Sequence, residues 1–302
     1  MQKKNRKKNI QAQLCALVIL CVLFSLYLNG RDALFSFSPT VGSSAAAIRL
    51  LPVYSYLETA RTGDFAIDCA NADMGYIAAA ANCEETVKIK IVSASGSERV
   101  YTVPNAGEAS YYPLSDGDGL YTITLLKKSG TDPDNNRYET VMSASCEADL
   151  YDEFQPFLRP STYVRFTGHS ECVNAAAQLC TGESDDNVKI ARIRQFVCEK
   201  LSYDDTAVDE ETQSYIRDPD EILSRGTGVC LDYAVLTAAM LRSQGIPAKV
   251  VYGSVVGTEG LHAWNMVYTT GGWIRVDTTF EDSGMDKSMI SNDENYHAAG
   301  WY

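Results

Sequence analysis

The sequence predicts a mixed α+β protein, in which a membrane helix and a small all-β sandwich precede an α+β domain. Three observations indicate this order. An apolar run follows a basic N-terminus, short alternating segments separated by turn residues fill the next part, and helical spacing replaces that alternation after residue 170. We therefore expect four regions, with boundaries at 1–30, 31–60, 61–150 and 151–302.

The first region, residues 1–30, combines five basic residues with the run Leu14–Leu28, which is apolar except for Ser25. A basic flank keeps the N-terminus in the cytoplasm, so the rest of the chain is expected outside. No good small-residue cleavage site follows closely, and we favour an uncleaved signal anchor over a cleaved signal peptide. The protein is then a single-pass cell-membrane protein with an extracellular body, or a secreted one after cleavage. Residues 31–60, rich in Ser, Ala and Pro, are expected to form a stalk.

Charge and metal-ligand spacing exclude several function classes. The net charge is −13, and residues 1–31 contain six Lys or Arg and no acid, so the remainder carries −19. An acidic body argues against nucleic acid as a partner, because phosphate contacts need a basic face. The three histidines show no zinc-ligand spacing, and we expect no metal or other cofactor. The acidic loop 132–136 is expected as a solvated turn, because Arg137 stands where a calcium loop needs glycine.

Residues 61–150 carry the β pattern. The clearest strands are Val87–Ile91, Arg99–Val103, Leu120–Leu125 and Tyr138–Cys146, with glycine-rich turns between them. Regular short strands of this kind favour a sandwich of two sheets. Tyr121 follows a glycine-rich turn and resembles the tyrosine corner of immunoglobulin-like domains.

Helical spacing begins after residue 170. We expect one helix over 170–179 and a second over 187–201, with Ser184 and Asp185 both suitable as its N-cap. Asp218 followed by Pro219 starts a third, short helix, because proline is favoured in the first turn.

Residues 225–280 contain the candidate catalytic residues. A glycine-rich loop, Gly226–Gly228, delivers Cys230 to the start of a helix. Strands then carry His262 and Asp277, so that cysteine, histidine and acid follow in that order. A helix N-terminus and a nearby imidazole both favour the thiolate, which is the reactive form of cysteine. A carboxylate beside the imidazole holds the ring in its working orientation.

Strand parity tests whether the histidine and the acid can meet. If Thr269–Gly272 form a four-residue hairpin loop, Trp264 faces Asp277 and His262 is the diagonal neighbour of Asp277. Diagonal neighbours lie roughly 7–8 Å apart at the backbone, which is within side-chain reach. The sequence therefore predicts that His262 and Asp277 interact and that Cys230 completes a triad with them.

Three motifs carry a family resemblance: Gly-Val-Cys-x-Asp-Tyr-Ala at Cys230, Leu-His-Ala-Trp-Asn at His262, and Gly-Trp-Ile-Arg-Val-Asp-x-Thr at Asp277. They resemble the transglutaminase-like superfamily, whose core is similar to papain-like cysteine proteases. The resemblance covers about the C-terminal half of the chain. It implies Cys230 as nucleophile, His262 as base and Asp277 as orienting acid. Thr278 stands where many members have proline, a difference that affects the turn more than the chemistry.

The resemblance also concerns Tyr203, which follows the helix 187–201. In the superfamily a tyrosine at this place often lies near the thiol, which implies Tyr203 as an oxyanion-hole donor beside the backbone N–H of Cys230. Packing at a domain edge is the alternative role for Tyr203. The implied fold is a papain-like or transglutaminase-like core, preceded by the immunoglobulin-like sandwich and the membrane helix.

Six of the nine cysteines remain after the apolar run and Cys230 are set aside. They fall three in each extracellular domain: Cys69, Cys83, Cys146, Cys172, Cys180 and Cys198. We expect at most one disulfide per domain, and the sequence does not choose among the possible pairings.

A thiolate, a base and an oxyanion hole together perform acyl transfer from an amide through a thioester. With water as acceptor the protein is a protease or amidase acting on peptide or protein amides, and this is the favoured function. With a lysine amine as acceptor it is a crosslinking transglutaminase. A third alternative is a non-catalytic interaction or scaffold module at the cell surface.

Overall fold

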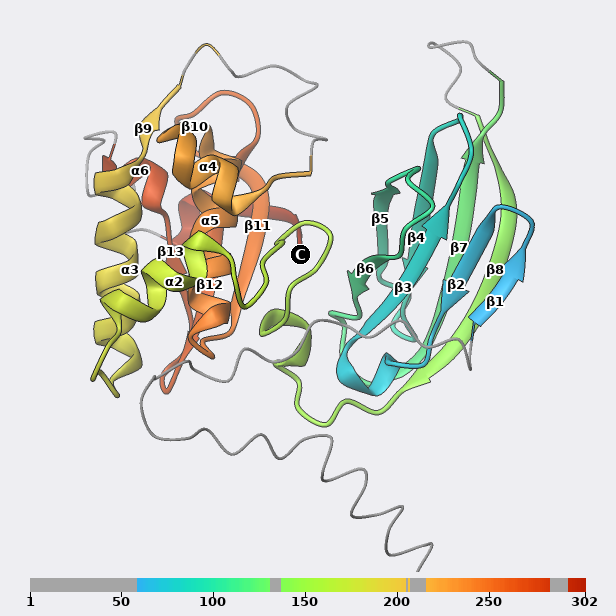
Figure 1. The fold of residues 1–302 in the computed structure, drawn as a ribbon, viewed down its shortest axis with the longest axis horizontal. Helices are drawn as coiled ribbons and strands as arrows, with labels where there is room; N and C mark the ends of the chain where they lie inside the picture. Colours follow the sequence, from blue (N-terminus) through green and yellow to red (C-terminus); the bar gives the residue numbers. More distant parts are fainter. Residues whose placement is uncertain (1–58, 131–136, 205, 207–215, 283–292) are drawn as a thin grey trace, which may run out of the picture. The chain divides into compact units, whose positions relative to one another are not determined.

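The computed structural model describes residues 59–130, 137–204, 206, 216–282 and 293–302, all within one compact unit that spans residues 45–302. The fold is mixed α+β, with antiparallel sheets first and helices packed on a further sheet after them (Figure 1). The expected membrane helix, the stalk as far as residue 58 and the acidic loop 132–136 lie outside the described residues. Within the described part, no helix has the length and apolar character needed to cross a membrane.

Two four-stranded antiparallel sheets occupy the first part. The first has the order β1-β2-β3-β6 and consists of β1 (Thr59–Thr62), β2 (Phe65–Asp68), β3 (Tyr76–Ala81) and β6 (Ser110–Pro113), with the 3-10 turn η1 (Ala72–Met74) between β2 and β3. The second has the order β5-β4-β7-β8 and consists of β4 (Val87–Val92), β5 (Glu98–Val103), β7 (Gly119–Lys128) and β8 (Tyr138–Ala148). The four strands that the sequence delimits are those of the second sheet. Strands of the first sheet are short or alanine-rich, so their alternation is weak.

Both sheets contribute to one hydrophobic core. In β4, buried and half-buried residues alternate along the strand, which places every second side chain in that core. The largest fully buried side chains from the two sheets are Ile67, Ile77, Ile89, Tyr112, Tyr121, Ile123 and Leu125. Fully burying a side chain of this size contributes roughly 1.5–3 kcal/mol. The Tyr121 hydroxyl donates to the carbonyl of Gly117 at 2.6 Å and accepts from the N–H of Asp116 at 3.2 Å, as in a tyrosine corner.

The segment between β8 and the first helix bonds to elements on both sides. It contains the 3-10 turn η2 (Gln155–Phe157). The hydroxyl of Tyr163 accepts from the N–H of Thr102 in β5 at 2.9 Å. The buried guanidinium of Arg242 donates to the carbonyls of Arg159 and Ala248, each at 2.9 Å. These bonds join the segment to the second sheet and to the helical part.

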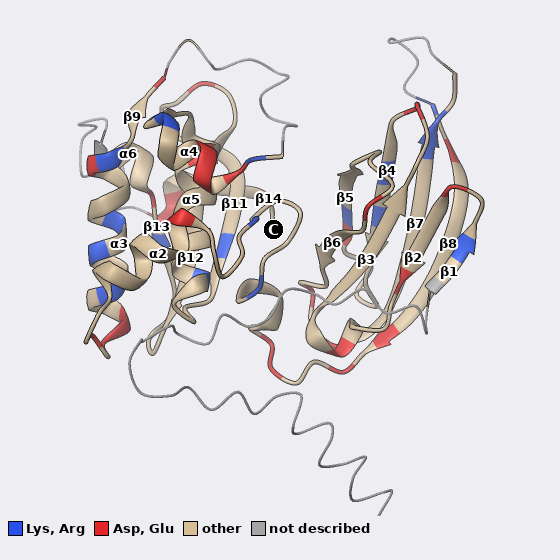
Figure 2. Ribbon diagram, in the orientation of Figure 1, with Lys and Arg blue, Asp and Glu red and all other residues tan. Residues whose placement is uncertain are grey.

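Four helices follow: α2 (Glu171–Leu179), α3 (Asp186–Lys200), α4 (Pro219–Arg225) and α5 (Cys230–Ser243). Asp185, one of the two candidates, caps α3 by accepting from the N–H of Asn187. Helix α4 starts at Pro219 as predicted, and Asp218 caps it. Basic residues lie along the length of α3 (Figure 2), and its apolar residues face α5. Helix α5 differs from its expected single apolar face, because every residue from Asp232 to Ser243 is buried. Helices α2, α3 and α4 and strands β11 and β12 all pack around α5.

A third antiparallel sheet has the order β13-β12-β11-β14 and consists of β11 (Ala248–Val255), β12 (His262–Thr269), β13 (Gly272–Val276) and β14 (Tyr296–Trp301). Short elements complete the chain: the parallel pair β9 (Ser202–Tyr203) and β10 (Thr227–Gly228), helix α6 (Thr278–Asp282) and the 3-10 turn η5 (Asp293–Asn295). The C-terminal aromatics Trp301 and Tyr302 pack against the hydrophobic clusters, and the pairing of β14 with β11 holds them there.

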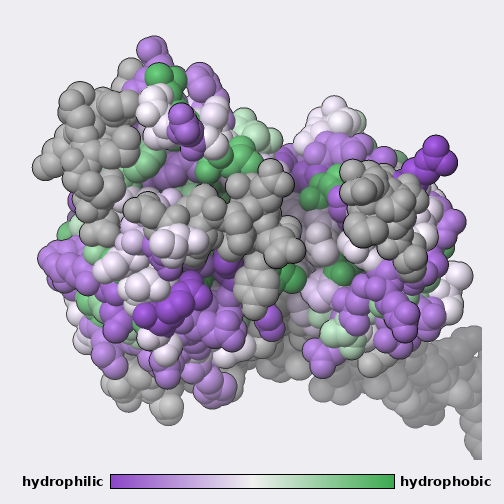
Figure 3. Space-filling view, turned by 90° about the horizontal axis from the view of Figure 1, so that it is seen from above, coloured by the Kyte–Doolittle hydropathy of each residue, from purple (hydrophilic) through white to green (hydrophobic). Residues whose placement is uncertain are grey.

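The described surface has no large apolar area on the face drawn in Figure 3, and several cysteines are unpaired. Apolar surface on the face drawn in Figure 3 forms small patches separated by hydrophilic residues. Cys83, Cys172, Cys180 and Cys230 carry free thiols.

Candidate active site

Cys230 is the first residue of α5, and the residues before it explain how it comes to lie there. Strand β10 pairs with β9, with Gly228 opposite Tyr203, and this short parallel pair leads the chain into the helix. The first N–H groups of a helix have no partner within the helix. Cys230 therefore lies where main-chain N–H groups are available to donate hydrogen bonds. The half-buried thiol lines a cavity of about 530 Å³.

Asp232 organises the start of α5. Its Oδ2 accepts from the N–H of Val229 at 2.9 Å, and its carboxylate forms ion pairs with Arg225 at 3.3 Å and Arg217 at 3.5 Å. A Cβ added at Gly228 would come within 2.6 Å of the Asp232 side chain, so glycine is needed there for close approach. The buried charge of Asp232 is therefore compensated by two arginines.

The hairpin of β12 and β13 has the register that the sequence predicted. Asn265 pairs with Val276, and the pairing continues to Thr269 opposite Gly272. Extended by one residue, this register places Trp264 opposite Asp277. The turn itself is tighter than expected, because Thr269 and Gly272 are the last pair and only two residues connect them. The loop still has an even number of residues, so the side chains of His262 and Asp277 remain on the same face of the hairpin.

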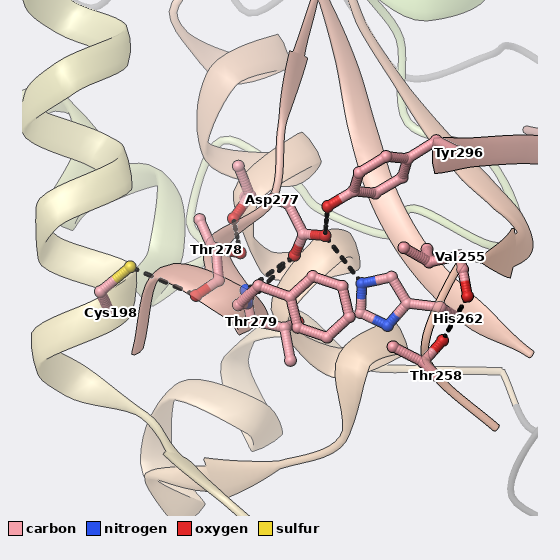
Figure 4. Close-up of polar contacts among 10 residues, drawn as sticks. Cys198, Val255, Thr258, His262, Asp277, Thr278, Thr279 and Tyr296 are labelled. Carbon is pink, nitrogen blue, oxygen red and sulfur yellow. Dashed lines mark hydrogen bonds and ion pairs between the residues drawn. The ribbon is translucent and has the colours of Figure 1, made fainter. Parts of the chain in front are cut away.

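Asp277 follows the end of β13 and begins α6. Its Oδ1 accepts from the N–H groups of Thr279 and Phe280, each at 3.2 Å, which is how an aspartate caps a helix (Figure 4). Its Oδ2 accepts from His262 Nε2 at 2.8 Å and from the Tyr296 hydroxyl at 2.9 Å. Thr278 occupies the first helical position, where proline is also favoured. Four donors thus hold a carboxylate that is 4% exposed.

The ring of His262 is held by a carboxylate and by an aromatic ring. Nε2–H donates to Asp277, and the Phe280 ring stacks on the imidazole with centroids 4.1 Å apart and planes inclined by 4°. Because Nε2 is bonded to Asp277, Nδ1 is the ring nitrogen left for the thiol of Cys230, which lines the same cavity. Burial disfavours the charged ring, but hydrogen bonds to Asp277 and Cys230, together with their charges, outweigh burial and raise the pKa of His262 to about 9.

Tyr203 lines the same cavity as Cys230 and His262. The Tyr203 side chain is 37% exposed, and its ring centroid lies 6.3 Å from that of Tyr233 in α5. Strand pairing with Gly228 holds Tyr203 beside the loop that ends at Cys230. Three of the four predicted site residues, Tyr203, Cys230 and His262, thus line one cavity, and the fourth, Asp277, lies behind His262 and bonds to its ring.

Sequence reasoning missed two residues of the site. Phe280 stacks on His262, and the only local signal was its position three residues after Asp277. Tyr296 lies in β14 and reaches Asp277 because that strand pairs with β11, a contact for which the sequence offered no signal (Figure 4).

Three solved structures resemble this chain. A protein of Cytophaga hutchinsonii named as a candidate cysteine protease is 19% identical, with coverage of 73% of this chain and 68% of that chain and a TM-score of 0.38. The periplasmic domain of TgpA from Pseudomonas aeruginosa is 14% identical, with coverage of 80% and 79% and a TM-score of 0.35. Calcium-bound LapG of Legionella pneumophila is 16% identical, with coverage of 45% and 77% and a TM-score of 0.34.

No curated protein shows significant similarity to this sequence. The family model of the transglutaminase-like superfamily matches residues 173–278, about a third of the chain. This segment begins in α2 and ends one residue after Asp277, so it contains Cys230, His262 and Asp277. Over residues 173–278, the chain thus matches the sequence pattern of the transglutaminase-like superfamily.

Proposed function

We propose that this protein is a cysteine-dependent amide hydrolase that acts on peptide or protein amides. Cys230 is the nucleophile, His262 is its acid–base partner and Asp277 orients the imidazole. The observation that carries the proposal is the 2.8 Å hydrogen bond from His262 Nε2 to Asp277, together with the single cavity that both His262 and Cys230 line. This is the arrangement that a nucleophile, its base and an orienting group require.

The reaction has two steps. The thiolate of Cys230 attacks the amide carbonyl, the C–N bond breaks, and the imidazolium of His262 gives its proton to the leaving amine. A water molecule then attacks the thioester, His262 accepts its proton, and the thiolate leaves with the acid as product. The N–H of Cys230, with Tyr203 as second donor, stabilises the oxyanion in both steps.

Water is proposed as the acceptor because the thiol is half-buried and its cavity has exposed residues at its rim, such as Leu261, which is 53% exposed. A primary amine at the same step gives crosslinking, and we keep this as the alternative. Both use the same three side chains, so the acceptor has to be measured.

The test uses the full chain, casein as substrate and a fluorescent primary amine. Casein fragments with new N-termini identify hydrolysis, and fluorescent casein identifies transfer. The Cys230→Ala variant is the control for both products. If neither product forms and a thiol-directed probe labels wild-type and Cys230→Ala proteins equally, the non-catalytic scaffold replaces the enzyme.

We propose further that the body is extracellular, anchored through residues 1–30, and that it contacts neither nucleic acid nor a metal cofactor. Protease added to intact cells should then remove the part after residue 31 and spare an N-terminal tag. Protection of the body would overturn this location.

A further inference from the structure

The cavity at Cys230 also contacts the second sheet, and it meets that sheet at an edge. Strand β5 is the outermost strand of the order β5-β4-β7-β8 (Figure 1). Three consecutive β5 residues line the cavity: Val100, Tyr101 and Thr102. Successive side chains of a strand point to opposite faces. Tyr101 is buried in the sandwich core, whereas Val100 is 48% exposed, so residues from both faces of β5 line the cavity. The cavity therefore borders the edge of the strand itself.

The register shows which main-chain groups of β5 point away from β4. Thr102 donates its N–H to the Tyr163 hydroxyl, and its carbonyl accepts from the Tyr112 hydroxyl at 3.3 Å, so both groups face outward. In an antiparallel pair, outward-facing residues alternate with paired ones. The register from Val92–Glu98 to Val87–Val103 has no bulge, so Val100 also faces outward. No hydrogen bond joins the outward groups of Val100 to any described residue.

Two further observations mark this place as a binding surface. The Tyr101 hydroxyl is buried and has no hydrogen-bond partner among the described residues, although the residue is only 6% exposed and lines the cavity. Large exposed apolar side chains also gather at this cavity: Val100, Tyr203, Tyr252 and Leu261 are 37–53% exposed. Apolar surface next to unused main-chain donors and acceptors fits a polypeptide better than a small amide.

We propose that the substrate of Cys230 is a polypeptide in extended conformation, which binds as an added strand along β5 at Val100. This inference rests on the proposed function and specifies its substrate class. The substrate main chain exchanges hydrogen bonds with the N–H and carbonyl of Val100. Its apolar side chains contact Tyr203, Tyr252 and Leu261, and the Tyr101 hydroxyl bonds to a substrate polar group. Folded proteins without a free strand and single amino-acid amides are poor substrates.

The test measures binding in the full chain with Cys230→Ala, so that it does not depend on turnover. The probe is fluorescein-labelled casein, an unfolded polypeptide, and the readout is fluorescence anisotropy. Val100→Pro removes the outward N–H, and proline is tolerated at an edge strand whose N–H faces outward. We expect it to weaken binding about 5- to 10-fold, the effect of one lost hydrogen bond.

Val100→Thr is the matched control, because it keeps the N–H and the branched shape, and its dissociation constant should stay within about twofold of that of the parent. Thermal unfolding shows whether Val100→Pro is folded. If it is not, Tyr101→Phe decides instead, because that hydroxyl has no protein partner to lose, and we expect about 2- to 5-fold weaker binding.

Equal affinity of the folded proline and threonine variants overturns the proposal, and so does an absence of casein binding, since main-chain pairing tolerates many sequences. Binding by Cys230→Ala without cleavage by the wild-type protein supports the docking site and contradicts the proposed hydrolysis. The two proposals therefore fail separately.

Discussion

Two buried aspartates, Asp277 and Asp232, flank the candidate site and differ in what compensates their charge. Both are at most 4% exposed, and both hold main-chain N–H groups at the start of a helix. Asp232 has two arginines beside it, at 3.3 and 3.5 Å. Asp277 has His262 at 2.8 Å and the hydroxyl of Tyr296 at 2.9 Å.

With the proposed function, the difference separates a structural carboxylate, Asp232, from a functional one, Asp277. An arginine stays charged at any ordinary pH, so the charge of Asp232 is compensated permanently and does not respond to the reaction. His262 gains and loses a proton, so the charge of Asp277 acts on the protonation of the imidazole. Whether a buried carboxylate near a nucleophile is structural or functional therefore depends on whether its partner gains and loses a proton, and not on how deeply the carboxylate is buried.

The largest expected effect is that of Asp277→Asn on the rate. The change is nearly isosteric and keeps an oxygen for the helix cap, but it removes the charge that orients and stabilises the protonated ring. We expect kcat/KM for casein cleavage to fall by about 10³- to 10⁴-fold, as in other triads, with the melting temperature changed little. A variant with near wild-type kcat/KM would show that another group orients His262.

Asp232→Asn should have the opposite effect, a loss of stability rather than a loss of kcat/KM. It leaves Arg217 buried with one fewer carboxylate, and it weakens the start of α5. We expect a loss of about 2–3 kcal/mol in the free energy of unfolding, less than for a fully buried pair because Arg225 is 49% exposed. Denaturant unfolding measures this loss. If the folded variant instead loses activity as Asp277→Asn does, the two aspartates are not divided as proposed.

The pH dependence follows from His262, whose pKa is raised from 6.5 to about 9. The imidazolium that protonates the leaving amine persists to that pH, so kcat/KM should fall as the pH rises through about 9. The same shift stabilises the fold. Its contribution is complete below about pH 6.5 and is lost as the pH rises through about 9.

Melting temperatures at pH 6 and pH 9.5 measure the stability effect, and His262→Gln, which has no titrating ring, is the control. A wild-type melting temperature that changes between these values no more than that of His262→Gln would contradict the raised pKa.

The smallest expected effect is that of Tyr296→Phe. It removes one of two donors to Asp277 Oδ2, so the carboxylate interacts more strongly with the imidazolium. We expect the alkaline limit of kcat/KM to move to higher pH, with a change in kcat/KM of about two- to fivefold near neutral pH. A lower alkaline limit, or a fold defect of the size expected for Asp232→Asn, would mean that Tyr296 acts by packing.

The candidate site was predictable to the extent that its chemistry is local in sequence. Cys230 follows a glycine-rich loop at a helix start, and the parity of the hairpin decides whether His262 and Asp277 share a side. These are consequences of helix caps and strand alternation, which need no knowledge of distant contacts. The superfamily resemblance then supplied the roles and pointed to Tyr203.

The rest could not be predicted, because it depends on segments that meet only in the folded chain. Helix α5 is buried on all sides because other helices and the third sheet surround it, and periodicity reports only one apolar face. Tyr296 donates to Asp277 because β14 crosses a gap of some 40 residues to pair with β11.

The sequence by itself determined the strands of the second sheet, the start of α4 at Pro219, two candidate caps for α3, and the hairpin register. Each depends on residues within a few positions of one another, so backbone geometry and local hydrogen bonds are sufficient to specify it. Only the tertiary structure decided which donors surround Asp277 and that β5 borders the cavity of Cys230. Those features arise from packing between residues far apart in the chain, and no local pattern encodes which distant surfaces come together.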